Sequence, residues 1–141
     1  MIATIEKKLE LAASPADVWR ALTDPSEVAS WFGETASFVP ELGGEGYFGW
    51  ESHGRFAMCI EEFDPPLRLA WRWAREANKP LDQTHSTVVE WTLLPRDNGG
   101  TTLLIRESGF ATEQSRQENV QGWEHELGEL VEFLQSDRSR A

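Results

Sequence analysis

The sequence predicts an α+β fold in the order strand, pair of short helices, six strands and one long helix. Three observations predict this order. From residue 33 to residue 108, short runs of alternating hydrophobicity are separated by turn residues, which is typical of an antiparallel sheet. A Ser-Pro-Ala-Asp run at 14–17 has the features of a helix start. From 113 to 136, apolar residues recur every three or four positions, which predicts an amphipathic helix.

The first three elements follow from local signals. Residues 5–11 alternate between apolar and charged side chains, with only Lys7 out of pattern, so we expect a half-buried strand. Ser14 is a favourable N-cap and Pro15 suits the first helical position, so a helix should begin here and end near Asp24-Pro25. Because proline can open a helix as readily as it ends one, a second short helix is expected at 26–32.

Six strands are expected in the middle of the chain, where Gly, Asn, Asp and Pro supply the turns between alternating runs. The polar stretch 76–83, interrupted by Pro80, is expected to be a surface loop. The predicted strands are Thr35–Pro40, Gly46–Glu51, Gly54–Phe63, Arg68–Arg75, Ser86–Leu94 and Thr101–Ser108.

The last helix carries its apolar residues in one stripe and its acids on the opposite side. Acids outnumber basic residues strongly between 107 and 137, so the outward face of this helix serves either solubility or docking to a basic partner. The stripe consists of Val120, Trp123, Leu127, Leu130, Val131 and Leu134.

Length and charge limit the classes of function. The 141 residues suit one domain over 1–141, and 24 acidic against 13 basic residues give a net charge of -11. This charge opposes phosphate contacts and anionic membranes, so we expect neither nucleic acid nor membrane as a partner. A single cysteine, Cys59, excludes an internal disulfide and suits a reducing cytoplasm. The first residues lack a signal-peptide pattern, so a cytoplasmic location is expected.

Four motifs, taken in order, resemble one protein family. They are the run at 14–25 with Val28 and Trp31-Phe32-Gly33, the Asp-Pro-Pro-Leu-Arg-Leu-Ala-Trp-Arg-Trp run at 64–73, the run from Gly100 to Phe110, and Gly122-Trp123 ahead of Leu127 and Leu130. The chain is similar along almost its whole length to the activator of Hsp90 ATPase homologue 1-like family. That family lies within the START-like or Bet v 1-like (SRPBCC) superfamily.

The resemblance implies a helix-grip fold, in which a curved antiparallel sheet wraps around the long C-terminal helix and leaves a cavity. Members of the superfamily bind sterols, lipids, plant hormones or polyketides, a few are cyclases or hydrolases, and the activator proteins act as co-chaperones. Fold alone does not choose among these. The first hypothesis is a binding protein for a small hydrophobic or aromatic ligand. The second is an Hsp90-type chaperone-linked or stress-response interaction domain, and the third is an enzyme.

Strand parity indicates which side chains face the cavity. Leu69, Trp71 and Trp73 share one face of their strand, and the same parity turns Glu107 inward beside Ile105. The aromatic residues either line an open pocket or fill the space beneath the helix. The candidate ligand-binding residues are Trp31, Phe32, Phe48, Phe56, Met58, Trp71, Trp73, His85, Val89, Trp91, Ile105, Glu107, Trp123 and Leu127.

Glu107 is the sharpest polar signal, because an inward carboxylate must find a partner or hold its proton. It could orient a ligand, serve as a general acid or base, or form an ion pair at the cavity rim. His53 and His125 are expected in solvent, and His85 at the end of its strand could reach the pocket. The sequence contains no catalytic triad motif, metal-ligand spacing or phosphate loop, so neither a metal nor another cofactor is expected.

Overall fold

The computed structural model describes residues 2–139, and its element order agrees with the sequence prediction. Most predicted boundaries lie within one residue of the observed ones, and the second helix begins at Pro25. The second strand ends two residues earlier than predicted, at Phe38, and the last helix runs to Ser139. The elements are β1 (Ile5–Leu11), α1 (Pro15–Thr23), α2 (Pro25–Trp31), β2 (Thr35–Phe38), β3 (Glu45–Trp50), β4 (Gly54–Asp64), β5 (Arg68–Ala74), the 3-10 turn η1 (Leu81–Gln83), β6 (Ser86–Pro95), β7 (Thr101–Ser108) and α3 (Glu113–Ser139).

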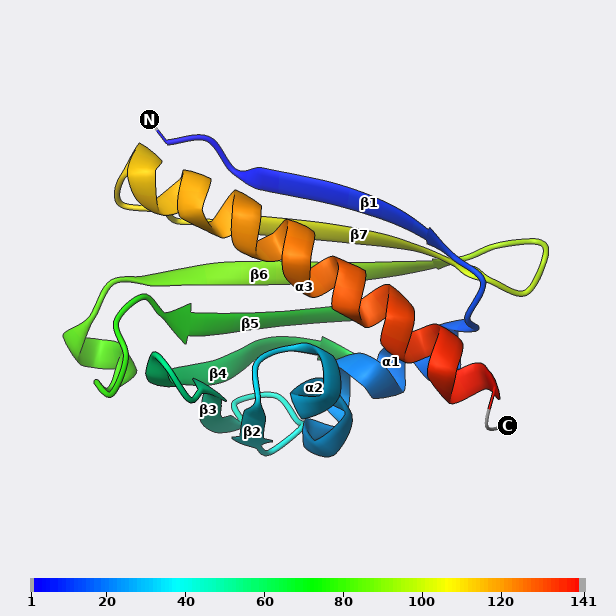
Figure 1. The fold of residues 1–141 in the computed structure, drawn as a ribbon, viewed down its shortest axis with the longest axis horizontal. Helices are drawn as coiled ribbons and strands as arrows, with labels where there is room; N and C mark the ends of the chain where they lie inside the picture. Colours follow the sequence, from blue (N-terminus) through cyan, green and yellow to red (C-terminus); the bar gives the residue numbers. More distant parts are fainter. Residues whose placement is uncertain (1, 140–141) are drawn as a thin grey trace.

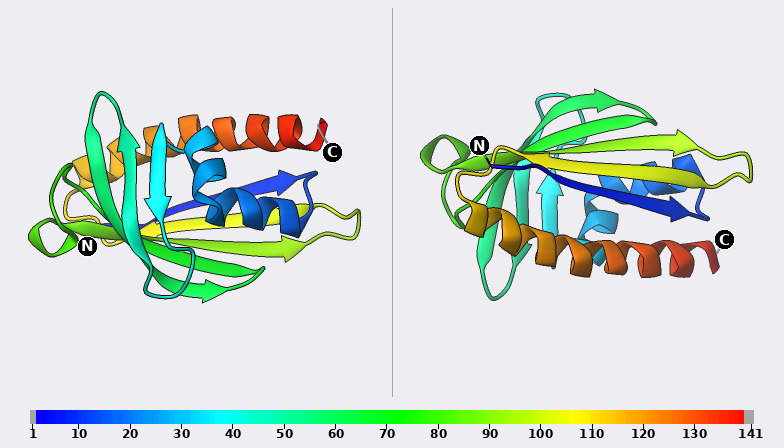
Figure 2. Two further views of the ribbon diagram at one scale, coloured as in Figure 1. Left: turned by 90° about the horizontal axis from the view of Figure 1, so that it is seen from below. Right: turned by 90° about the horizontal axis from the view of Figure 1, so that it is seen from above.

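One antiparallel sheet, in the order β1-β7-β6-β5-β4-β3-β2, bends around α3. Figure 1 shows α3 crossing the sheet diagonally, and Figure 2 shows β2, β3 and β4 turned steeply against β6 and β7. The register of β4 against β5 shifts between Ile60 and Glu62. Because a bulge bends its strand and increases the local twist, this irregularity helps the sheet to wrap the helix.

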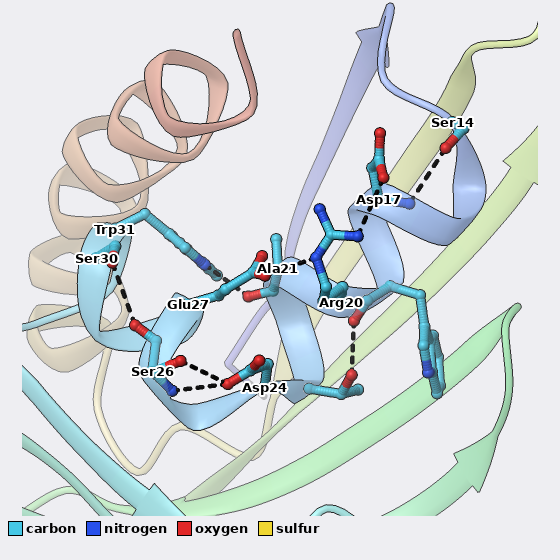
Figure 3. A network of polar contacts seen from close by, with 11 residues as sticks. Ser14, Asp17, Arg20, Ala21, Asp24, Ser26, Glu27, Ser30 and Trp31 are labelled. Atoms are coloured by element: carbon cyan, nitrogen blue, oxygen red, sulfur yellow. Dashed lines mark hydrogen bonds and ion pairs between the residues drawn. The ribbon is translucent and has the colours of Figure 1, made fainter. Parts of the chain in front are cut away.

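The helix pair α1 and α2 depends on two side-chain caps (Figure 3). The Ser14 hydroxyl accepts a hydrogen bond from the Asp17 backbone N–H at 3.2 Å, as expected for an N-cap. Asp24 closes α1 and also caps α2, where its carboxylate accepts from the Ser26 backbone N–H at 3.0 Å. This second cap moves the start of α2 to Pro25, because proline lacks the N–H that a first helical residue leaves unpaired.

Two further contacts hold these helices together. The Trp31 indole donates to the carbonyl oxygen of Ala21 at 2.8 Å, and Arg20 Nε lies 2.6 Å from the carboxylate of Glu27 (Figure 3). Trp31 itself is 2% exposed and its ring packs edge-on against Trp91. The pair therefore closes one side of the space between sheet and α3.

The core lies between the concave face of the sheet and α3. Trp123, Leu127, Leu130 and Leu134 of the predicted stripe are all buried, and Trp71, Trp91 and Phe48 of the sheet are at most 1% exposed. Lys7, the residue out of pattern in β1, lies 3.7 Å from Glu124 of α3 as an ion pair. Within residues 2–139, the helices are too short or too polar to cross a membrane.

Candidate functional site

Glu107 lies near the end of β7, opposite Ile5 of β1 and Val89 of β6, and its side chain is fully buried. Four side chains donate hydrogen bonds to its carboxylate. Oε2 accepts from the Trp73 indole at 2.8 Å and from the Thr87 hydroxyl at 2.6 Å. Oε1 accepts from the Asn119 amide at 2.9 Å and from the Trp123 indole at 2.7 Å.

This network ties three strands to α3. The donors come from β5, β6 and α3, and the indole and amide nitrogens among them can only donate. An acceptor-only carboxylate matches such a set, because each oxygen receives two donors. Glu107 therefore fixes the orientation of Trp73, Asn119 and Trp123.

A pocket of about 260 Å³ opens between the first half of α3 and the β3–β5 end of the sheet. Trp73, Asn119 and Trp123 form part of its wall, so Glu107 lies behind the wall and holds three of its members. Five aromatic rings dominate the lining. The complete lining is Phe32, Trp50, His53, Phe56, Trp73, Arg75, Asn119, Gly122, Trp123 and Glu126.

Phe32, at the end of α2, links the pocket to the core. Its ring stacks on Trp123 at 5.5 Å between centroids and contacts Trp50 and Trp73 at 5.3 and 5.4 Å. The next residue, Gly33, has a φ of 71°, and a Cβ there would lie 2.8 Å from the Gly49 carbonyl oxygen. Only glycine allows α2 to approach β3 this closely, so Gly33 sets the position of the Phe32 and Trp50 rings.

Two charged side chains lie on the lining. Arg75 follows β5 and is half-buried, with Cζ 4.5 Å from the centroid of the Trp73 ring. Burial lowers the pKa of its guanidinium, while the negative charges of Glu107 and Glu118 oppose that change. Burial also raises the pKa of the Glu126 carboxyl on α3, against the lowering effect of the Gly33 backbone N–H. The pocket thus combines aromatic walls with one cation and one weakly acidic carboxyl.

The family description "Activator of Hsp90 ATPase homolog 1-like protein" matches residues 12–135. The chain belongs to this family. No curated protein matches the sequence.

Solved structures of other proteins have the same fold. Protein MLL2253 from Mesorhizobium loti superposes with a TM-score of 0.83 at 24% identity, over 95% of this chain and 98% of that one. CalU16 from Micromonospora echinospora gives 0.74 at 26% identity, over 97% and 79%. DynU16, a putative protein in the dynemicin biosynthetic locus, gives 0.80 at 25% identity, over 95% of this chain and 48% of that chain.

The structure divides the fourteen candidate binding residues into four groups. Phe32, Phe56, Trp73 and Trp123 line the pocket, and Glu107 lies behind it. Eight lie in the packed core at 0–5% exposure. His85 is exposed and lies outside the lining, one residue before β6 begins at Ser86. The eight core residues are Trp31, Phe48, Met58, Trp71, Val89, Trp91, Ile105 and Leu127.

Six lining residues were not predicted from the sequence, although most of them fit the same strand and helix periodicities. Asn119, Gly122 and Glu126 lie four before, one before and three after Trp123 in α3. Trp50 has the parity of Phe48 in β3, and Arg75 continues the parity of Trp71 and Trp73. His53 was expected in solvent; it is exposed and also lies at the rim. Among the side chains of residues 2–136, no group of three or more His, Cys, Asp and Glu residues could hold a metal ion.

Proposed function

We propose that this protein binds a small, largely aromatic or apolar molecule in the pocket beside Trp123. The observation that carries this proposal is a pocket of about 260 Å³ whose lining includes five aromatic rings. Ligand sites combine apolar walls with a few fixed polar groups, and Asn119, Arg75 and Glu126 supply such groups here. The volume lies below the usual range for drug-sized ligands, about 300–1,000 Å³, so one or two fused rings fit best.

The state of Glu107 supports binding over acid–base catalysis. A general acid or base must reach the proton that it transfers. Glu107 is fully buried, is absent from the pocket lining, and already accepts four hydrogen bonds. The same contacts give the pocket rigid walls, which lowers the entropy lost when a ligand binds.

The test uses 2-acetylnaphthalene, a neutral two-ring probe, and the indole N–H signals of a 15N-labelled protein. We expect the signals of Trp50, Trp73 and Trp123 to shift on titration, because these rings line the pocket. The signal of Trp19 should stay in place, because its ring packs against Phe63 outside the lining. If Trp50, Trp73 and Trp123 do not shift at saturating probe, the proposal is wrong.

Two glycines of α3 provide matched variants. A Cβ at either Gly122 or Gly128 would meet no atom within 4 Å, but only Gly122 lines the pocket. Gly122→Leu should weaken binding of 2-acetylnaphthalene by filling the pocket, and Gly128→Leu should leave binding unchanged. Both substitutions replace a helical glycine by leucine, so their effects on helix stability are comparable. Equal affinity in the two variants would contradict the proposed location.

Contact with an Hsp90-type chaperone is a second candidate, and it rests on the family match. An ATPase assay with and without this protein tests it directly. A rise in the chaperone's ATPase rate would support the second candidate.

The relation to DynU16 of the dynemicin biosynthetic locus, at 25% identity, is in keeping with the first proposal, a small-molecule role.

A further inference from the structure

Arg75 lies in the pocket lining without an anionic partner in the described part of the chain. On the convex side of the sheet, Arg72 pairs with Glu61 at 2.7 Å and Arg68 with Glu62 at 2.8 Å. Among the described side chains, those of residues 2–136, no acidic group lies within ion-pair distance of Arg75, and its buried Nε has no hydrogen-bond partner. A buried donor without a partner is costly and uncommon in native proteins, so this nitrogen calls for an acceptor.

Glu107 does not supply that acceptor. Its two oxygens already accept from two indoles, a hydroxyl and an amide, and they lie behind the pocket wall. Arg75 instead lies on the lining with its guanidinium against the Trp73 ring, which holds the charged group at the pocket surface. A ligand in the pocket is therefore in contact with both the aromatic walls and a guanidinium that has no ion pair.

From this geometry we infer that the pocket takes a small aromatic carboxylate, with its carboxylate on Arg75 and its ring among Phe32, Trp50 and Phe56. This inference rests on the proposed binding function and specifies the ligand class. A planar carboxylate suits Arg75, because a guanidinium can donate two parallel hydrogen bonds to it. The net charge of -11 disfavours anions at long range, so the contact with Arg75 must supply the selectivity.

The position of Glu126 fixes how such an acid would lie. Glu126 is also on the lining, from α3, whereas Arg75 follows β5. A ligand carboxylate beside an ionised Glu126 would be repelled, so the acid group lies at Arg75 and away from Glu126. The other titratable groups near this pocket are His53 at the rim, Glu34, His125 and Glu129 near Glu126, and Glu118, whose charge acts on Arg75.

The experiment compares 2-naphthoate with 2-acetylnaphthalene, which has nearly the same shape but a methyl ketone in place of the carboxylate. Affinities are measured from the indole signals of Trp50, Trp73 and Trp123. We expect wild type to bind 2-naphthoate more tightly than the ketone. Arg75→Met should weaken 2-naphthoate by about tenfold or more, the usual value of a hydrogen bond to a charged group, and should weaken the neutral ketone much less.

Two more variants separate charge from shape. Arg75→Lys retains the positive charge and should recover part of the preference for 2-naphthoate. Arg55→Met is the matched control, since Arg55 also lies on an aromatic ring, with Cζ 4.3 Å from the Tyr47 centroid, but is outside this pocket. It should change neither affinity.

The outcomes distinguish the two proposals. Binding of the ketone in the pocket with no preference for 2-naphthoate, or with an equal loss of both probes in Arg75→Met, would overturn the inference and leave the proposed binding function standing. Failure of both probes to shift the three indole signals would overturn both. A preference for 2-naphthoate that disappears only when Arg75 loses its charge supports the inference.

Discussion

The two halves of α3 face different interiors. Under its second half, Leu130 and Leu134 are at most 3% exposed and pack into a core that α1 and α2 close. Under its first half, Asn119 and Glu126 occupy the same face of the helix and a pocket remains between them and the sheet. The change from apolar to polar side chains within one stripe marks where the core ends. A continuous apolar stripe thus indicates packing, and polar residues within it indicate a site.

Replacing one aromatic ring in the packed core and one in the pocket wall is expected to give the largest difference in unfolding free energy. Trp91 is fully buried, and its ring contacts those of Trp71 at 5.3 Å and Trp123 at 5.5 Å. Trp91→Ala should lower the free energy of unfolding by about 4 kcal/mol, the usual loss for a buried large ring. Phe56→Ala, in the pocket wall, should cost about half as much, because this ring is only half-buried. Urea unfolding compares the two, and equal losses would contradict the distinction.

Changing Glu107, at the centre of the hydrogen-bond network behind the pocket wall, should give the next largest loss of unfolding free energy. Glu107→Gln replaces one carboxylate oxygen by an N–H₂ group, which then faces two donors. We expect a loss of about 2 kcal/mol, the usual effect of buried polar groups left without partners, together with shifted indole signals of Trp73 and Trp123. Glu62→Gln is the control, because the pair of Glu62 with Arg68 is largely exposed and should be worth about 1 kcal/mol or less. Unfolding by urea measures both variants.

Removing a cap from the α1–α2 pair should destabilise the packed core under the second half of α3 and leave the pocket unchanged. Asp24→Ala removes the carboxylate that caps α2 and should cost about 1 kcal/mol of unfolding free energy. The affinity for 2-acetylnaphthalene should stay constant, because Asp24 lies outside the pocket. Asp97→Ala, in an exposed turn, is the control and should leave the thermal unfolding midpoint unchanged. Weaker probe binding in Asp24→Ala would show that the two halves are coupled.

The smallest effect is expected at Glu126. The pKa of Glu126 is raised in the folded protein, so ionisation of this carboxyl destabilises the folded state. The destabilisation is complete above the folded-state pKa and absent below the unfolded-state pKa. Glu126→Gln should therefore be slightly more stable than wild type at neutral pH. The difference should shrink as the pH falls to about 4, where an ordinary glutamate is half protonated. Thermal unfolding across this pH range measures it, and a constant difference would contradict the assignment.

The sequence predicted the fold better than the pocket. Alternation in the strands, the N-cap at Ser14, the proline at Pro25 and the stripe through Trp123 each depend on neighbours in the chain, and each led to the correct element. Which aromatic residues leave space around them depends on how the sheet bends, and that bend includes the bulge between Ile60 and Glu62. Parity placed Trp73 and Trp91 on one inner surface but could not separate wall from core.

The contacts of Glu107 also order the assembly of the protein in time. Its donors lie 34 and 20 residues earlier in the chain, at Trp73 and Thr87, and 12 and 16 residues later, at Asn119 and Trp123. A chain growing from its N-terminus can pair β5, β6 and β7 before it holds either α3 donor. The pocket wall is complete only after α3 has been synthesised and has docked, so a bound ligand would report a docked α3.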